Sequence, residues 1–242
     1  MIKSIHTINR NMNILQKKQE NTSANIANVK TPGFKFQDIV QSTLESKEML
    51  NYSGGNKNNR RQELGAFTFG NQIDEVYRNF EQGSLVETGN SKDFAIVGNG
   101  FFTIQMGNGQ VGFTRNGNFK LNEENQLVTI DGYQVLRVDA NGQQDYIYLD
   151  NDEISATNFL ISDFSDYGNL ASAGNTIFTS DAGGNEVIIG EISQGYLEMS
   201  NVVIADELVR MIEISREFEA NQKLLHTADE TLNKAVNEIG RV

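Results

Sequence analysis

The chain lacks several kinds of residue on which common chemistries depend. It has no cysteine among its 242 residues, which excludes disulfides, a thiolate nucleophile, cysteine-ligated zinc and iron–sulfur clusters. Its two histidines, His6 and His226, leave almost no basis for a histidine metal site or for Ser-His-Asp catalysis. No stretch of about 18 consecutive apolar residues occurs, so we expect no membrane-spanning helix.

Positive charge is also in short supply. The chain has 20 Lys and Arg against 32 Asp and Glu, a net charge of −12, which opposes binding to nucleic acids and to anionic lipid. Residues 1–15 lack the continuous apolar stretch of a secretory leader. What the chain does contain, 38% hydrophobic residues including 14 Phe, predicts a folded protein with a sizeable core.

The first segment has the spacing of a helix that faces another helix. Its apolar residues recur at alternating steps of three and four, the period of a coiled-coil seam. We expect the helix to end near Val29, because the proline of Thr31-Pro32-Gly33 lacks an N–H and disfavours helix at the preceding residue. The seam positions that we predict to form an assembly interface here are Ile5, Ile8, Met12, Leu15, Ile26 and Val29.

The last segment repeats this pattern. Ser200-Asn201 offers capping side chains, so we expect the helix to begin near Val202. Polar residues at Ser215, Gln222 and Asp229 interrupt an otherwise apolar seam. The positions that we predict to form an assembly interface in this segment are Leu208, Met211, Phe218, Leu225, Leu232, Val236 and Ile239.

The two ends of the chain carry opposite charge. Residues 1–35 hold six Lys and Arg and one acid, whereas residues 196–242 hold nine acids and five bases. Opposite charges favour the meeting of the two ends. We predict a mixed α and β fold in which the N- and C-terminal helices pair as a coiled coil, with a central antiparallel β-rich domain between them in the sequence. The predicted divisions are an N-terminal helix in 1–35, a linker or loop in 36–66, a β-rich domain in 67–195 and a C-terminal helix in 196–242.

The middle of the chain reads as short strands broken by Gly, Asn and Asp. Asn116-Gly117 and Asp131-Gly132 are the dipeptides that tight hairpin turns favour. Such strands indicate an antiparallel sheet with local connections rather than alternating βαβ units. The predicted strands are Phe94–Val97, Phe101–Ile104, Val111–Thr114, Gln126–Ile130, Gln134–Leu136, Tyr146–Leu149, Phe159–Ile161 and Glu186–Ile189.

Three sequence motifs resemble catalytic or ligand-binding motifs, but the residues around them do not support such a function. Gly107–Gly112 matches the dinucleotide pattern G-x-G-x-x-G, but strand and turn residues follow it, so we predict a hairpin turn. Asp150–Glu153 lacks the third ligand and the glycine of a calcium loop. The acid pair Glu123-Glu124 has no identifiable partner and reads as a solvated turn. We therefore predict no catalytic residue, no metal and no cofactor.

Three stretches together resemble the flagellar rod and hook family of bacteria. Residues 25–35, NIANVKTPGFK, are similar to the family's N-terminal signature, and residues 93–102, 113–119 and 127–133 to its central strands. Residues 194–202, QGYLEMSNV, are similar to its entry into the last helix. The motif residues that carry the resemblance are Asn25, Asn28, Thr31, Pro32, Gly33, Phe34, Gly195, Tyr196, Ser200 and Asn201.

This resemblance implies a structural subunit of the flagellar basal-body rod, most similar to the distal-rod type, with the proximal-rod type next. It implies paired terminal helices that line a hollow helical shaft and transmit torque from motor to hook. Expected partners are copies of itself, other rod and hook proteins and the flagellar export apparatus, through which the chain leaves without a cleaved signal peptide. No nucleic acid and no membrane insertion are expected.

Alternatives stay open at this stage. A hook-type subunit of the same family fits the same motifs. A β-rich surface protein that binds glycans through its aromatic residues is an alternative from another class, although it leaves both heptad arrays unexplained. A hydrolase that uses surface carboxylates is the weakest alternative, because no acid has a partner.

Overall fold

The computed structural model describes residues 2–53, 60–107, 109–138, 143–148, 159–174, 176–180, 186–187 and 191–239. These residues form two compact units. Unit 1 consists of Met1–Ile26, Gln37–Arg78 and Ile204–Val242, and unit 2 of Ala27–Phe36 and Asn79–Val203. None of the described helices has an apolar stretch long enough to cross a lipid bilayer.

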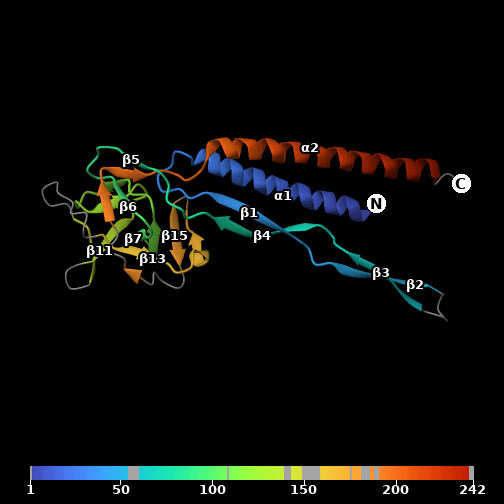
Figure 1. Ribbon diagram of the computed structural model, residues 1–242, viewed down its shortest axis with the longest axis horizontal. Coiled ribbons are helices and arrows are strands. Elements are labelled where there is room, and N and C mark those ends of the chain that lie inside the picture. Colours follow the sequence, from blue (N-terminus) through green and yellow to red (C-terminus); the bar gives the residue numbers. More distant parts are fainter. Residues whose placement is uncertain are drawn as a thin grey trace. The chain divides into compact units, whose positions relative to one another are not determined.

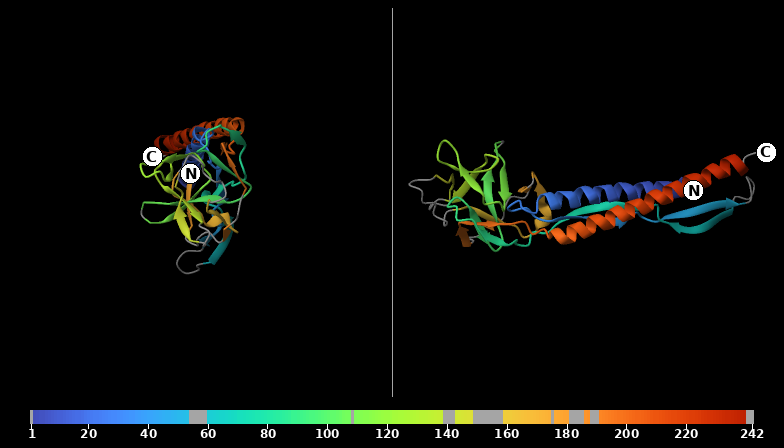
Figure 2. Two further views of the ribbon diagram at one scale, coloured as in Figure 1. Left: turned by 90° about the vertical axis from the view of Figure 1, so that its left-hand side faces the viewer. Right: turned by 90° about the horizontal axis from the view of Figure 1, so that it is seen from above.

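Two long helices from opposite ends of the chain lie side by side in unit 1 (Figures 1 and 2). Helix α1 spans Ile2–Ala27, and helix α2 spans Ile204–Lys234 and continues as the π-helical segment η3, Ala235–Ile239. The predicted pairing of the terminal helices is confirmed. Asn25, near the end of α1, contacts Glu207, near the start of α2, so the two helices run antiparallel.

The rest of unit 1 is a long β-hairpin where the sequence predicts a linker or loop. Strands β1 (Gln37–Thr43) and β4 (Asn71–Arg78) pair over their whole length, and β2 (Lys47–Ser53) pairs with β3 (Arg60–Phe67). The linker prediction for residues 36–66 is wrong in this respect. It failed because these strands are largely exposed and therefore lack the apolar–polar alternation of a strand on a core.

Unit 2 is built from short antiparallel strands, as predicted. In the described part of the chain, ten strands join one sheet, and β17–β6 and β18–β5 form two further pairs. Its strands are β5 (Leu85–Glu87), β6 (Phe94–Val97), β7 (Phe101–Gln105), β8 (Val111–Thr114), β9 (Phe119–Leu121), β10 (Leu127–Thr129), β11 (Gln134–Val138), β12 (Gln144–Tyr146), β13 (Ile161–Asp163), β14 (Leu170–Ser172), β15 (Ile177–Ser180), β16 (Glu186–Val187), β17 (Glu191–Gln194) and β18 (Tyr196–Glu198), with a short 3-10 helix η2 (Tyr167–Asn169) before β14.

Two of the three turn predictions are confirmed. The turn at the start of Gly107–Gly112 joins the paired strands β7 and β8, and Val111 and Gly112 already belong to β8. Asp131-Gly132 joins the paired strands β10 and β11. Asn116-Gly117 is not a hairpin turn, because β8 and β9 on either side of it do not pair with each other. Glycine is needed at 117 for another reason: a Cβ atom there would lie 1.6 Å from the carbonyl oxygen of Phe94.

Some predicted strands differ in extent from the observed ones. The strand predicted at Tyr146–Leu149 lies earlier, at Gln144–Tyr146, where it pairs with β11. Leu149, residues 188–189 and Asp150–Glu153 lie outside the described residues.

Phenylalanine dominates the core of unit 2. Phe94, Phe102, Phe119 and Phe159 pack against one another at ring-centroid distances of 4.8 to 6.3 Å, with aliphatic side chains from β6, β7 and β11 around them. A second cluster centres on Phe101, whose neighbours include Phe178. Aromatic pairs of this kind stabilise a fold beyond their buried area, so unit 2 has the packing of a finished domain.

Candidate assembly interface

The α1–α2 pair is joined near the end of α1 by a buried polar contact. Asn25 is fully buried, and its Nδ2 donates to Glu207 Oε2 at 2.9 Å. The same side chain donates to the Gln37 carbonyl at 2.8 Å and accepts from the Gln37 N–H at 3.2 Å. Asn25 of the signature motif thus ties together α1, α2 and the first residue of β1.

The buried face of α2 repeats every seven residues, as predicted. Half of its positions, however, are shifted by one residue from the predicted seam. Glu207, Ile214 and Asn221 are 1%, 5% and 8% exposed. They stand one residue before the predicted seats at 208, 215 and 222. Four predicted interface residues on α2 are half-buried on the same face, namely Met211, Phe218, Leu225 and Leu232.

The other predicted positions of this segment point outward or lie beyond α2. Leu208 is 48% exposed and Val236 is 70% exposed. Val236 and Ile239 belong to η3. Ile204 and Ile212 are 47% and 54% exposed, so the first turns of α2 present an apolar outer face. Isolated exposed apolar residues are ordinary, but a continuous apolar helix face is typical of an interface.

Helix α1 buries its predicted seam to a greater extent. Leu15 is 2% exposed, and its neighbour Ile14, which the pattern did not select, is 4% exposed. Val29 lies beyond the end of the helix. The remaining predicted residues are half-buried, namely Ile5, Ile8, Met12 and Ile26.

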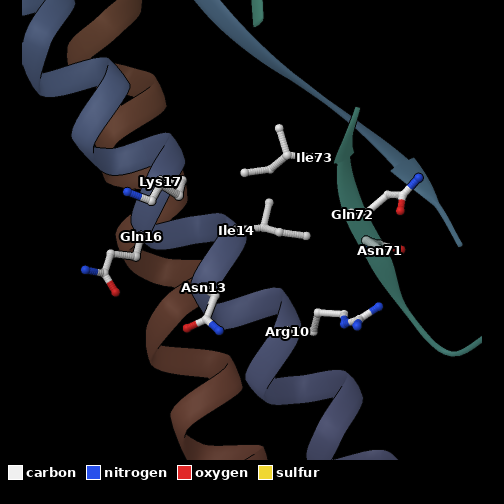
Figure 3. A pocket seen from close by; sticks show the side chains of 8 residues that line it. All are labelled: Arg10, Asn13, Ile14, Gln16, Lys17, Asn71, Gln72 and Ile73. Atoms are coloured by element: carbon white, nitrogen blue, oxygen red, sulfur yellow. The ribbon is translucent and has the colours of Figure 1, made fainter. Parts of the chain in front are cut away.

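A groove of about 510 Å³ opens between α1 and β4 (Figure 3). Ile14 of α1 and Ile73 of β4 point toward each other across it, and Arg10 reaches from α1 toward β4. Its remaining lining residues are polar or charged: Asn13, Gln16, Lys17, Asn71 and Gln72. The groove therefore has an apolar floor between two cationic side chains of α1.

In unit 2, the segments that lead from α1 and into α2 are bound to each other. The Gly33 N–H donates to the Glu198 carbonyl at 2.8 Å, and the Phe36 N–H donates to Asn201 Oδ1 at 2.8 Å. Gly33 has φ +71°, and a Cβ there would lie 2.3 Å from the backbone nitrogen of Asn116. Glycine is thus required at 33 by both its conformation and its close neighbour.

The other motif residues support these connecting segments. Thr31 Oγ1 donates to Asn28 Oδ1 at 3.1 Å, and Ser200 Oγ accepts from the Val202 N–H at 3.2 Å. Gly195, at φ +80°, accepts from the Thr88 N–H at 2.8 Å. Phe34 is buried, Pro32 is half-buried, and Tyr196 pairs with Glu87 in the β18–β5 ladder.

A buried charge cluster, Lys35, Arg115 and Glu198, links all three signature stretches. Lys35 Nζ lies 2.6 Å from Glu198 Oε1, and Arg115 Nη1 lies 3.1 Å from Glu198 Oε2. Lys35 Nζ also donates to the Glu81 carbonyl at 2.7 Å, and the Gly83 N–H donates to Glu198 Oε1 at 3.0 Å. The three charged side chains are at most 3% exposed, and in the described residues Glu198 forms an ion pair with both buried cations.

The electrostatics of this cluster are set by its burial. Burial lowers the pKa of Lys35, and the neighbouring Glu198 carboxylate opposes that change. The Arg115 guanidinium lies 5.3 Å from the centroid of the Phe101 ring. Its Nε is buried and has no hydrogen-bond partner among the described residues. The cluster therefore depends strongly on Glu198.

The sequence analysis did not select Lys35, Arg115, Glu198 or Glu207 as site residues. The signal that could have found the first three is the scarcity of charge in the signature stretches: Arg115 and Glu198 are the sole charges of 113–119 and 194–202, and Lys35 is one of two in 25–35. Charges of opposite sign at such positions suit one buried cluster, but their pairing depends on which stretches meet in space.

Residues capable of chemistry do not converge in the described part of the chain. No group of three or more His, Asp or Glu there is placed to hold a metal ion. His6 is exposed, and the exposed His226 lies 3.4 Å from Glu230 on its own helix. Glu123 and Glu124 are exposed.

Comparison with protein families identifies three matching segments. A family described as "Flagella basal body rod protein" matches residues 10–35. The "Flagellar hook protein FlgE/F/G D1 domain" matches residues 95–164, and "Flagellar basal body rod FlgEFG protein C-terminal" matches residues 193–238. The rod-protein match covers most of α1 and its connecting segment, and the C-terminal match covers all of α2.

Similar proteins match over nearly the whole chain. Flagellar basal-body rod protein FlgG of Buchnera aphidicola subsp. Baizongia pistaciae is 32% identical over 93% of this chain and 92% of the relative. FlgG of Borreliella burgdorferi is 31% identical over 98% of each chain. FlgG of Bacillus subtilis is 31% identical over 98% of this chain and 99% of its own. The chain belongs to the FlgG-type flagellar basal-body rod proteins, a family of non-enzymatic structural subunits.

Proposed function

We propose that the chain assembles through its terminal helices, with copies of itself and with other rod and hook proteins, into a hollow helical shaft. The shaft transmits torque from the motor to the hook. Contacts that do not close into a ring generate a helical filament, and helix faces are suited to such contacts. In this proposal the terminal segments 1–35 and 196–242 make the contacts between copies, and the chain leaves through the flagellar export apparatus without a cleaved signal peptide.

The observation that carries this proposal is the unsatisfied apolar surface of unit 1. Its α2 exposes Ile204, Leu208 and Ile212, and its hairpin exposes Val76 and Tyr77 at 57% and 54%. Large exposed apolar faces typically mark interaction surfaces. Unit 1 buries few apolar side chains of its own, so packing against further copies would complete its core.

Substitution of the buried seam tests the proposal. Leu15→Asp and Leu225→Asp place a charge in the helix pair, and we expect both to block incorporation into the rod while unit 2 stays folded. Ile130→Asp is the matched control, because Ile130 is a 54% exposed aliphatic residue of unit 2. Basal bodies counted by electron microscopy and swimming in soft agar provide the measurement. Normal rods and normal swimming in both seam variants would refute the proposal.

A further inference from the structure

Two cations of α1, Arg10 and Lys17, form no ion pair with α2 in the part of the chain that the structure describes. In the described residues Arg10 makes no ion pair, and Lys17 pairs only with Glu20 of its own helix, at 2.8 Å. Asp206 and Glu213 of α2 likewise make no ion pair there. The described polar contacts between the two helices of one chain are hydrogen bonds from an amide to a carboxylate, such as that of Asn11 with Glu217. Arg10 and Lys17 of α1 and Asp206 and Glu213 of α2 therefore remain available for contacts with another molecule.

The α1–β4 groove places two of these cations at a fixed spacing. Arg10 and Lys17 are seven residues apart on α1, and Ile14 lies between them on the same face. Seven residues make two helical turns, on the order of 10 Å along the axis. Ile73 on β4 forms the opposite wall and is 38% exposed, so the apolar floor is only partly covered.

An exposed face of α2 that comprises Asp206, Val209 and Glu213 has the complementary pattern. Asp206 and Glu213 are exposed and seven residues apart, and Val209 lies between them at 56% exposure. Glu213 also borders a pocket that Lys18 of α1 and Asp38 of β1 line. The same two-turn spacing separates the two anions as separates the two cations of the groove. The α2 of the same chain cannot enter the groove with this face, because it already turns Glu207 and Ile214 inward.

From this match we propose that the α1–β4 groove binds the Asp206–Val209–Glu213 face of α2 from a second copy of the chain. Val209 of that copy packs on Ile14 and Ile73, while Asp206 and Glu213 pair with Arg10 and Lys17. The inference rests on the proposed function and adds which surfaces of two copies meet. Charge complementarity selects the partner, and the apolar contact between the charged pairs excludes water.

A charge-swap experiment tests this contact in the source bacterium, with each variant replacing the full-length chain. Arg10→Glu with Lys17→Glu, and separately Asp206→Lys with Glu213→Lys, place like charges opposite each other. We expect each double variant to reduce the number of rods by at least about tenfold, because like-charge juxtaposition opposes binding. The quadruple variant, which restores opposite charges in reversed order, is expected to recover most of the rods.

Matched controls separate the groove from general charge effects. Lys120→Glu and Glu124→Lys reverse exposed charges of unit 2, outside the terminal segments, and should leave rod number unchanged. Normal rods in both double variants, or a quadruple variant no better than the doubles, would overturn the proposal. If Leu15→Asp blocks assembly while the charge reversals do not, the groove contact fails and the rod function stands. If Leu15→Asp and Leu225→Asp both assemble normally, the rod function itself fails.

Disulfide trapping gives a direct readout, and the absence of native cysteine makes it clean. Two single-cysteine variants, Ile73→Cys and Val209→Cys, are expressed together, so that any bond between them joins two copies. We expect a dimer band on a non-reducing gel of isolated basal bodies. Ile73→Cys with Leu224→Cys, a 56% exposed position elsewhere on α2, is the control pair and should give none. Equal bands for both pairs, or no band for either pair, would contradict the proposed contact.

Discussion

The two units of the chain solve the problem of burying apolar surface in opposite ways. Unit 2 buries Phe94, Phe102 and Phe178 completely and also contains the buried cluster of Lys35, Arg115 and Glu198. Unit 1 buries Ile14, Leu15 and Ile214 but leaves much of its apolar surface in water. From this difference we expect unit 2 to be stable as a folded body and unit 1 to depend on contacts with further copies.

The comparison is tested most strongly by removing an aromatic ring from each unit. Phe102→Ala empties a fully buried site against Phe119 and Phe159 and should lower the free energy of unfolding by about 3–5 kcal/mol. Phe67→Ala in the hairpin of unit 1 is the matched control, because Phe67 is 43% exposed, and it should change stability far less. Urea unfolding followed by circular dichroism measures both, and equal losses would refute the contrast.

The next largest effect is expected at the charge cluster of unit 2. Glu198→Gln keeps the shape of the side chain but leaves Lys35 and Arg115 without their anion, which should cost about 3–5 kcal/mol. Glu191→Gln removes an exposed carboxylate of β17 and should change stability by less than about 0.5 kcal/mol. The same urea titrations apply. A loss at Glu198 no larger than at Glu191 would show that the cluster contributes little.

A smaller effect, confined to unit 1, is expected from Leu15→Ala. Truncation of this buried leucine should destabilise the helix pair by about 2–3 kcal/mol. Amide hydrogen exchange should then speed up in α1 and α2 but not in the strands of unit 2. Leu224→Ala, at a 56% exposed position of α2, is the control. Faster exchange throughout both units would mean that they unfold together.

The smallest effect is a pH dependence from Lys35. Its pKa is lower in the folded chain than the ordinary value of 10.5, so the unfolded chain binds more protons between the two values. The free energy of unfolding should therefore rise with pH in the window that ends at 10.5. Lys35→Met removes this group and should remove that part of the slope. Parallel curves for the two proteins would contradict a lowered pKa.

Helix positions were predictable because their signals are local. The proline after Thr31 ends the first helix from the sequence alone, and the observed end, Ala27, lies two residues before the predicted Val29. The start of α2 at Ile204 likewise lies two residues from Val202. The face that each helix buries was less predictable. Both possible buried faces of α2 contain apolar as well as polar residues, so the sequence does not distinguish them. Contact with α1 decides that position 207 is buried and position 208 is exposed.

The hairpin of unit 1 and the charge cluster of unit 2 escaped prediction for a shared reason. Strands β1 to β4 are held by pairing with each other, so their side chains carry no core-facing alternation. Lys35, Arg115 and Glu198 stand far apart in the chain and are joined only after three segments meet. Neither the hairpin nor the charge cluster produces a periodic pattern of apolar residues in the sequence around it.

The residues alone were sufficient to predict the class of the fold and the helical ends. Heptad spacing and turn dipeptides depend on residues that are close together in the sequence, so they can be recognised without the folded structure. Which helix face is buried, which charges pair and where the α1–β4 groove opens were decided by the folded structure. These properties depend on the distances between segments remote in sequence, and only packing sets those distances.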